Sequence, residues 1–343
     1  MLTKAREIVV ERRSVPVPGA KDVLVRVAAV GICGSDVHYY EEGRSGDYIV
    51  EQPLVLGHEA SGIVIAVGDD VTALRTGQRV SIEPGTPCRT CRYCQIGAYN
   101  MCLSMRFHAT PPIDGSFAEY VVVHESVAHP VPDSVSDEEA ALLEPLSVGI
   151  WAARKAEIAP GDRVLINGAG PIGVIAAQVA REFGASDVVI VDVNEFRLEL
   201  AQRVGIDTTI LAGGDEAQAL PPTFDVLIEC SGNAAATHWA IGRMANLGRV
   251  VLVGVGGSDL VIPLGTVQSR ELAIDGVFRY ANTWPTAIDL VSRGRISLAP
   301  LITGRFTLDE VDTALNEGRN NPHSMKPVVY PGEPSDPTKG DQS

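Results

Sequence analysis

Two adjacent side chains, the imidazole of His58 and the carboxylate of Glu59, are the first pair in this chain that can do chemistry. Nitrogen and oxygen donors of this kind are ligands for Zn²⁺. The competing interpretation is structural, with a hydrogen-bonded His58 and a solvated Glu59. Neighbours on a regular strand point to opposite faces, so a shared ion requires irregular backbone, which Gly57 can supply. Metal binding by this pair therefore depends on further ligands elsewhere in the chain.

Two more residues can complete such a site. Cys33 lies between two glycines at the end of a predicted strand, and Glu144 is an acid inside an otherwise apolar run. Alone, a cysteine is more often a small buried hydrophobe, and an acid at a helix end usually faces water. Together with His58 and Glu59, they offer the mixed sulfur, nitrogen and oxygen ligands of a zinc site with an open position.

A second cluster consists of four cysteines in a short loop rich in proline and glycine, at Cys88, Cys91, Cys94 and Cys102. Four thiolates around Zn²⁺ form a closed, tetrahedral, structural site. An iron-sulfur cluster is the rival ligand, but nothing else in the sequence suggests electron transfer. Four buried structural cysteines so close together in a polar loop are a remote alternative. The spacing therefore predicts a metal with a structural role.

A glycine-rich turn follows the predicted strand 163–167, whose centre is Val164-Leu165-Ile166, and opens a predicted helix. The turn has the sequence Gly168-Ala-Gly170-Pro171-Ile172-Gly173. In this context the pattern is a dinucleotide fingerprint. The first glycine permits the tight turn, the second lets backbone amides approach a pyrophosphate, and the third allows close helix packing. Proline early in the helix removes no needed N–H group.

The cofactor is predicted from Asp192, which ends the next strand. A carboxylate here accepts hydrogen bonds from the adenosine ribose hydroxyls and repels a 2′-phosphate, so NAD is favoured over NADP. Arg197 tempers this preference, because a guanidinium can neutralise a phosphate.

These residues need two kinds of element to position them. Up to about residue 130 the chain shows short β-type runs broken by Gly, Pro and Asp, and residues 137–153 are helical in pattern. From residue 161 strands alternate with helices at 171–183 and 194–204, which predicts a parallel sheet. Six strands are expected, at 163–167, 188–192, 208–211, 225–230, 249–254 and 272–277.

Composition bounds the function. The 343 residues exceed what one hydrophobic core usually serves, so two domains are expected. A net charge of −15 disfavours nucleic acid and anionic membranes as partners. We find no run long enough to span a membrane and no signal peptide, and we expect a cytoplasmic protein.

The motifs together resemble one family, the zinc-dependent medium-chain dehydrogenases, and among them the sorbitol and xylitol (polyol) dehydrogenases. The resemblance covers about residues 23–329 and rests on the four-cysteine loop and on segments 31–38 (GICGSDVH), 57–62 (GHEASG), 109–112 (ATPP), 144–149 (EPLSVG), 168–173 (GAGPIG) and 277–285 (VFRYANTWP). It implies an α/β architecture: a GroES-like, mainly-β catalytic domain with a six-stranded parallel Rossmann domain inserted in it. We accordingly place the first part of the catalytic domain at 1–147, the Rossmann NAD-binding domain at 148–280, the return segment at 281–330, and a disordered tail at 331–343.

The resemblance also implies roles for individual residues. Cys33, His58 and Glu59 match catalytic zinc ligands, with Glu144 bound directly or through water. Ordinary alcohol dehydrogenases have a cysteine at the position of Glu144, so this chain departs from them toward the polyol and threonine dehydrogenases. The remaining matches are Ser35 and His38 for the proton relay, Val253, Gly254, Val255, Val277, Phe278 and Arg279 for the nicotinamide, and Tyr39, Phe107, Arg279 and Tyr280 for the substrate.

The implied activity is oxidation of a secondary hydroxyl of a polyol to the ketose, with NAD as acceptor and one catalytic and one structural zinc per chain. Threonine or 2,3-butanediol dehydrogenase is the alternative within the class. A zinc-free quinone reductase is disfavoured by the retained ligands, and a non-catalytic, nucleotide-binding member is less consistent for the same reason. The resemblance implies a homotetramer.

Overall fold

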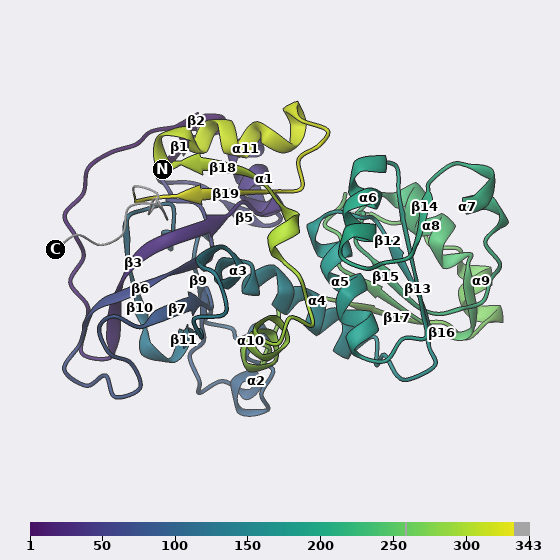
Figure 1. Cartoon of the computed structure of the whole chain (residues 1–343), viewed down its shortest axis with the longest axis horizontal. Coiled ribbons are helices and arrows are strands. Elements are labelled where there is room, and N and C mark those ends of the chain that lie inside the picture. The colour runs from purple at the N-terminus through teal and green to yellow at the C-terminus, as the bar shows by residue number, and fades with distance from the viewer. Residues whose placement is uncertain (258, 333–343) are drawn as a thin grey trace. The chain divides into compact units, whose positions relative to one another are not determined.

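The computed structural model describes residues 1–257 and 259–332, which form two compact units (Figure 1). Unit 1 comprises Met1–Cys94, Cys102–Glu144 and the described chain from Ile302 onward. Unit 2 comprises Gln95–Met101 and Pro145–Leu301.

Unit 1 is built on a seven-stranded sheet in the order β11-β7-β6-β3-β19-β18, with β10 paired to β3. Its strands are β3 (Asp22–Gly31), β6 (Glu59–Val67), β7 (Arg79–Ile82), β10 (Tyr120–His124), β11 (Ala128–Pro130), β18 (Ile302–Thr307) and β19 (Lys326–Tyr330). The last strand pairs antiparallel with β3, with Val328 opposite Gly31. The end of β3, just before Cys33, therefore lies next to β19, a strand from the C-terminal part of the sequence.

Shorter elements complete unit 1. The strands are β1 (Leu2–Lys4), β2 (Glu7–Ile8), β4 (Arg44–Ser45), β5 (Tyr48–Ile49), β8 (Gly85–Thr86) and β9 (Arg106–Phe107), and the helical segments are α1 (Gly34–Glu42), α2 (Arg92–Gln95), η2 (Glu125–Val127), α3 (Asp137–Ala141), η4 (Leu308–Glu310) and α11 (Val311–Asn320). Ser136 begins α3 as its N-cap, accepting from the amide of Glu139. The helical pattern predicted for 137–153 is two helices, because α3 ends at Leu142 and α4 (Leu143–Lys155) follows.

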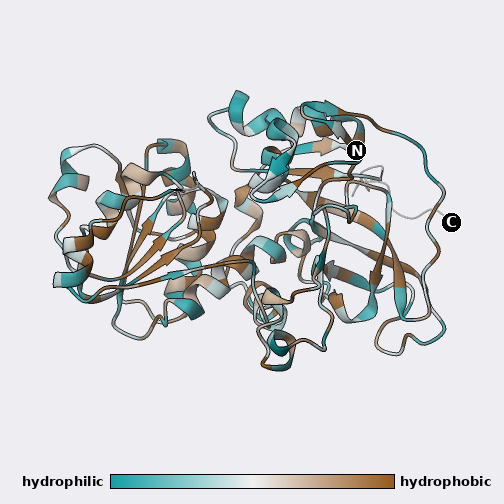
Figure 2. Ribbon diagram, turned by 180° about the vertical axis from the view of Figure 1, so that it is seen from behind, coloured by the Kyte–Doolittle hydropathy of each residue, from teal (hydrophilic) through white to brown (hydrophobic). Residues whose placement is uncertain are grey.

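Unit 2 contains a six-stranded sheet in the order β14-β13-β12-β15-β16-β17, and every pair in it is parallel. Its strands are β12 (Arg163–Asn167), β13 (Asp187–Asp192), β14 (Thr208–Leu211), β15 (Phe224–Glu229), β16 (Met244–Leu252) and β17 (Ala273–Gly276). This is the doubly wound order of a Rossmann domain, so the predicted α/β fold class is confirmed. The strands are apolar along much of their length (Figure 2), as expected for a sheet covered on both faces.

Helices connect these strands. They are α5 (Pro171–Glu182), α6 (Glu195–Arg203), α7 (Asp215–Ala219), α8 (Ala234–Ile241) and α9 (Leu264–Ser269). Unit 2 also contains α10 (Trp284–Ser292), which follows β17, and the short turns η1 (Tyr99–Met101) and η3 (Ala299–Leu301). Strand order reverses between β12 and β15. Because parallel crossovers are right-handed, α5 and α8 cover opposite faces of the sheet.

Our expected boundaries differ from these units in three places, because residues 95–101 and 145–147, which we expected in the catalytic domain, also belong to unit 2. We expected the return segment to begin at 281, but unit 2 extends to Leu301 and includes α10. One physical reason is that Arg154 of α4 donates to the carbonyl of Asn282 (2.8 Å) and to the hydroxyl of Thr286 (3.0 Å). Most of the tail expected to be disordered, residues 333–343, lies outside the described residues.

Among the described residues, no helix combines the length and the apolar character needed to cross a bilayer.

Candidate functional site

Three side chains meet at the point where β3 gives way to α1. A sulfur, a nitrogen and a carboxylate oxygen from Cys33, His58 and Glu59 all lie within 4.8 Å of one another. His58 precedes β6, which begins at Glu59, and Gly57 has a φ of +86°. This irregular backbone removes the objection that two neighbours on a strand face opposite ways. All three residues are thus placed to share one ion.

Asp36 organises this group from the first turn of α1. Its side chain is fully buried, and it accepts from the amides of Cys33 (3.0 Å) and Gly57 (2.9 Å). Its Oδ1 also lies 3.7 Å from Nδ1 of His58. Burial alone would lower the pKa of His58, but Cys33 and Asp36 raise it well above its ordinary value. The surroundings of the imidazole therefore favour positive charge.

Lys326, the first residue of β19, reaches the same group. Its ammonium lies 2.6 Å from Oε1 of Glu59 and donates to the carbonyl of Ile32 at 2.7 Å. Burial lowers the pKa of Lys326, but Glu59, Cys33 and Glu144 outweigh it and raise the pKa. The carboxylate of Glu59 can lie this close to the backbone of β3 because residue 31 is a glycine. A Cβ at Gly31 would lie 2.1 Å from Oε2 of Glu59.

The donor set fits a zinc ion. Oε2 of Glu59 is buried and has no hydrogen-bond partner among the described residues, as expected of an oxygen that faces a cation. Thiolate, imidazole and carboxylate are the ligands that zinc accepts, and three protein ligands leave a fourth position open.

Glu144 lies in the first turn of α4, is 5% exposed, and acts on the pKa of Lys326. It is not one of the three residues whose ligand atoms group within 4.8 Å.

The two residues expected to form the proton relay, Ser35 and His38, both lie on α1. The side chain of His38 is 43% exposed, and its Nδ1 lies 3.9 Å from Oε1 of Glu42.

Two expected substrate residues border the metal group. Tyr39 is 3% exposed, and both Thr110 and His58 act on the pKa of its hydroxyl, which burial raises. The ring of Phe107 lies 5.6 Å from the His58 ring, tilted by 54°. Unit 1 thus supplies an aromatic wall beside His58.

The four cysteines of the 88–102 loop also group within 4.8 Å. Sulfur atoms of Cys91 and Cys94 are 3.5 Å apart, and those of Cys88 and Cys94 are 4.0 Å apart. Ligand bonds of about 2.3 Å in a tetrahedron place sulfurs about 3.8 Å apart, so these distances fit zinc. Hydrogen bonds from Thr90 lower the pKa of Cys88 to about 6, whereas burial raises that of Cys94 to about 12. A central cation would hold all four as thiolates.

The glycine turn in unit 2 has the geometry that a dinucleotide needs. Gly168 has a φ of +100°, and a Cβ there would lie 2.8 Å from the amide of Ser231. A Cβ on Gly173 would lie 1.8 Å from the carbonyl of Gly168, so the helix packs directly on the turn. A Cβ on Gly170, the N-cap of α5, would meet nothing within 4 Å. The open space in front of that N-terminus fits a pyrophosphate.

Asp192 ends β13 beside this turn. One carboxylate oxygen accepts from the amide of Ala169 at 2.6 Å, and the other from the amide of Asn194 at 2.8 Å. Arg197 lies in the first turn of α6, and its Nε has no hydrogen-bond partner among the described residues. The carboxylate of Asp192 therefore lies at the glycine turn, as a dinucleotide fingerprint requires.

The other expected cofactor segments follow β16 and β17. The amides of Val253 and Gly254 donate to the carbonyl of Glu229, both at 2.9 Å, and the amide of Val277 donates to Leu252 at 3.0 Å. These segments thus join the glycine turn at the carboxyl edge of the sheet, where open α/β sheets bind ligands. Next in the chain, the guanidinium of Arg279 lies 4.7 Å from the centre of the Phe278 ring, and the Tyr280 ring lies 5.2 Å from that of Trp284.

Comparison with known proteins agrees with this geometry. Residues 19–133 match the family described as alcohol dehydrogenase GroES-like domain, and residues 171–293 match the one described as zinc-binding dehydrogenase. A sorbitol dehydrogenase from Gallus gallus is 43% identical over 315 residues, which cover 90% of this chain and 89% of that protein. The chain belongs to the zinc-dependent medium-chain dehydrogenase family.

Solved structures extend the likeness of this dehydrogenase to its fold. The L-idonate 5-dehydrogenase from Escherichia coli str. K-12 substr. MG1655 is 33% identical, with a TM-score of 0.85 over 91% of both chains. The 2R,3R-butanediol dehydrogenase from Bacillus subtilis is 27% identical, with a TM-score of 0.88 over 96% of this chain and 98% of that one.

Sequence reasoning missed two residues at the metal group of the dehydrogenase. Asp36 could have been found from the sequence, since an acid three residues after Cys33 is placed to accept from the amide of Cys33, the N-cap of α1. Lys326 carries none, because it stands 267 positions from Glu59 and meets it only through the pairing of β19 with β3.

Proposed function

We propose that this chain is an NAD-linked, zinc-dependent polyol dehydrogenase that oxidises a secondary hydroxyl of sorbitol, xylitol or a similar sugar alcohol to the ketose. The observation that carries the proposal is the buried group of Cys33, His58 and Glu59, an open-position zinc site in a chain that also has a dinucleotide turn. The sorbitol dehydrogenase relative supports the substrate class.

When bound, zinc acts as a Lewis acid on the alcohol oxygen and NAD accepts the hydride. The residues of the chain then handle the proton. Ser35 and His38 stand three apart on α1 and so share one face of the helix. Because the His38 side chain is 43% exposed, it forms the outer end of a relay from Ser35 to solvent. Glu144, buried near Lys326, is the second carboxylate that can serve the metal.

The substrate residues suit a molecule with several hydroxyls. Tyr39 and Phe107 border His58 and shield the reacting carbon from water. Arg279 offers five N–H donors, and Tyr280 adds a hydroxyl, so neighbouring hydroxyls of a polyol find partners.

A 2,3-butanediol dehydrogenase is the second candidate, since the structural likeness to such an enzyme spans 96% of this chain. A diol needs fewer hydrogen-bond donors than a sugar alcohol, and the two functions therefore differ in how much they depend on Arg279.

The test is an NAD-coupled rate panel over sorbitol, xylitol, galactitol, ribitol, threitol, 2,3-butanediol and threonine, with zinc counted per chain. We expect the highest kcat/KM on a five- or six-carbon polyol and one zinc for each of the two ligand groups. Faster turnover of butanediol or threonine than of every polyol would overturn the substrate assignment. Conversion without the zinc at Cys33, His58 and Glu59 would overturn the mechanism.

Asp192 is proposed to select NAD over NADP. Asp192→Asn keeps an acceptor for the Ala169 amide but removes the charge that repels a 2′-phosphate. We expect the NAD/NADP ratio of kcat/KM to fall by at least about tenfold, equivalent to ~1.4 kcal/mol. Glu199→Gln, in an exposed pair on α6, gives a matched control that also removes one acidic charge from unit 2, and it should leave the ratio unchanged. An unchanged ratio in Asp192→Asn would show that the ribose assignment is wrong.

We also propose a cytoplasmic homotetramer. Its location is supported by six cysteines without disulfides in the structure. Its assembly is supported by β17, which within the described chain pairs with β16 alone and so forms an edge of its sheet. It is also supported by exposed apolar side chains in unit 2, Leu247, Val255, Val261 and Leu264. Light scattering on the purified protein measures the number of subunits.

A further inference from the structure

The loop between the third and fourth cysteines belongs with a different unit from the cysteines themselves. Residues Gln95–Met101 form part of unit 2, while Cys94 and Cys102 on either side form part of unit 1. The sulfur atoms of those two cysteines lie within 4.8 Å of one another. The metal group therefore closes the loop at its base and fixes the distance between its ends.

This loop makes three hydrogen bonds to the segment that follows β17. The side-chain amide of Asn100 donates to the carbonyl of Phe278 at 2.9 Å. The side-chain amide of Asn282 donates to the carbonyl of Gly97 at 2.9 Å, and its backbone amide donates to the hydroxyl of Tyr99 at 2.8 Å. Asn100 is only 5% exposed, so its bond to Phe278 is protected from water.

The contacted segment needs external support. Arg279 and Asn282 have φ values of 56° and 57°, a left-handed conformation that side chains other than glycine adopt at a cost. Such conformations persist where the surroundings over-determine them. The segment contains no regular helix or strand between β17 and α10, so hydrogen bonds from outside it hold it: those of the loop and one from Arg154 of α4 to the carbonyl of Asn282. Asn100 fixes the carbonyl just before Arg279, and Asn282 ties the other end.

We propose that the loop Gly97–Asn100, closed by the four-cysteine group, positions the segment Phe278–Asn282 for substrate and nicotinamide. Asn100 acts as a positioning residue, because its bond to the carbonyl of Phe278 sets the backbone that carries Arg279. The structural metal would then influence substrate affinity as well as stability. This inference rests on the proposed function only for the role of Arg279.

The test combines hydrogen exchange of the segment with steady-state kinetics in Asn100→Leu. The variant keeps the volume of the side chain but removes the donor to Phe278. We expect exchange of the amides in 278–282 and the KM for the polyol each to rise by about tenfold, with kcat and the zinc count little changed. Tyr99→Phe removes the acceptor of the Asn282 amide and provides a second, milder variant should Asn100→Leu fail to fold.

Gln178→Leu is the matched control. Gln178 is also a buried amide of unit 2, 4% exposed, and it holds a different loop by two bonds to the backbone of Ser297, at 2.8 and 3.1 Å. We expect faster exchange near Ser297 but none at 278–282, and an unchanged KM. Equal exchange at 278–282 in wild type and both loop variants would overturn the proposal.

Loss of the metal from the four-cysteine group provides an independent test of the proposal. Cys102→Ser should raise exchange at 278–282 under conditions where the core of unit 2 stays protected, whereas unchanged exchange in a variant lacking that zinc would contradict the inference. Exchange is measured without substrate, so this outcome does not depend on polyol turnover. A wild-type enzyme inactive on every polyol would refute the proposed function and leave the exchange result as the test of the loop.

Discussion

Asp36 is a single buried carboxylate that accepts from two amides and faces one imidazole in the metal group. Asp36→Asn would present an amide N–H₂ group to at least one of these donors, so the ligands would lose their fixed orientation. We expect zinc affinity at this site to fall about 10- to 100-fold. Competition with a chromogenic chelator measures the affinity. The four-cysteine group is the internal control, and equal affinity loss at both sites would indicate general misfolding instead.

Lys326 and a metal ion can each bind a different carboxylate oxygen of Glu59. The ammonium lies on Oε1, while the buried Oε2 has no partner among the described residues. Lys326→Met should therefore cost about 3–5 kcal/mol in metal-free protein, because it leaves a buried charge unpaired. The loss should be smaller with zinc bound, since the ion compensates Glu59.

Urea unfolding with and without zinc measures this difference. Lys155→Met is the control, because Lys155 pairs with Asp275 at a more exposed position, and it should cost no more than about 1 kcal/mol in either state. Equal losses for Lys326→Met in both states would contradict the idea that the ion shares Glu59.

Residue types and spacing were enough to predict the group of Cys33, His58 and Glu59, because each is a good zinc ligand and both Cys33 and His58 adjoin a glycine. The structure brings Asp192 to the glycine turn, where it accepts from the amide of Ala169 at 2.6 Å, while its role toward the cofactor stays a prediction. The role of Lys326 could not be predicted from the sequence. Its chemistry depends on which strand pairs with β3, and a lone lysine in a short apolar strand gives no sign of its partner.

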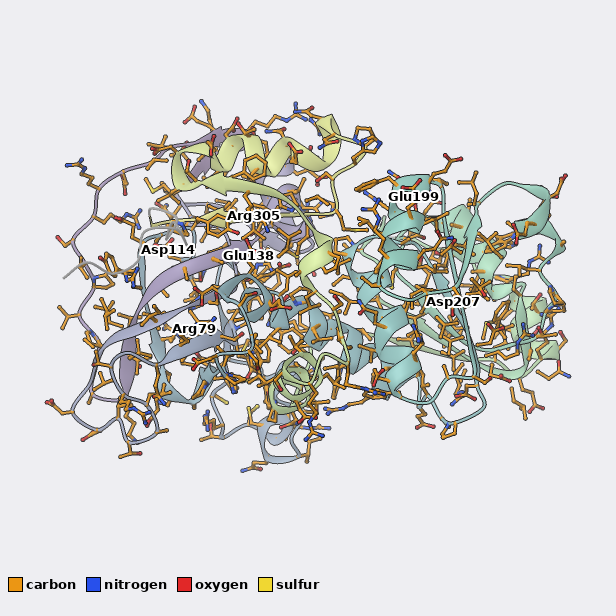
Figure 3. The ribbon with its side chains drawn as sticks, in the orientation of Figure 1. Arg79, Asp114, Glu138, Glu199, Asp207 and Arg305 are labelled. Carbon is orange, nitrogen blue, oxygen red and sulfur yellow. The ribbon has the colours of Figure 1, made fainter. Side chains whose placement is uncertain are left out.

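At the scale of elements, Glu138 ties α3 to two strands from the end of the chain. Arg305 of β18 lies beside it (Figure 3) and donates to its two oxygens at 2.7 and 3.0 Å. The hydroxyl of Tyr330 in β19 also donates to it. Burial raises the pKa of Glu138, but Arg305 and Tyr330 outweigh it and lower the pKa.

A lowered folded-state pKa gives stability that is fully present above the unfolded value of about 4.3 and is lost as pH falls through the folded value. Glu138→Gln should thus cost about 1 kcal/mol near neutral pH, since Arg305 is partly exposed, and progressively less below about pH 4. Denaturant midpoints across that range measure it. Glu199→Gln, in an exposed pair on α6, should show almost no effect at any pH. A constant cost for Glu138→Gln down to acid pH would contradict the linkage.

Elements with a strong local pattern were predicted closely, and those that depend on tertiary contacts were not. Strand β12 and helix α5 match their expected bounds to within a residue, because a glycine turn separates the apolar residues 164–166 from an alanine-rich run. Strand β18 was missed, since Gly304 and alternating polar residues weaken its pattern and only β19 pairs with it. The helix predicted across 137–153 was wrong in one detail, because the break at Leu142 leaves no mark in composition.

At the scale of the whole molecule, both metal groups lie in unit 1 and the dinucleotide turn lies in unit 2. Each unit has its own apolar core, one around Leu54, Ile82 and Val329 and the other around Leu165, Phe224 and Met244. Ligands of one unit should therefore stabilise that unit separately. We expect EDTA to lower the thermal midpoint of unit 1, and ADP-ribose, which lacks the nicotinamide, to raise that of unit 2.

Calorimetry with and without each ligand tests this separation. ADP-ribose at about 100 times its Kd should add ~2.7 kcal/mol. For a unit of this size that corresponds to a rise of about 5–10 °C. Asp192→Asn should reduce the rise, and Cys102→Ser should reproduce part of the EDTA effect. Segment Phe278–Asn282 contributes no residue to the apolar cluster around Leu165, Phe224 and Met244, so its loosening on metal loss should leave that midpoint nearly unchanged. A single transition that EDTA and ADP-ribose move in opposite directions would mean that the two units unfold as one cooperative body.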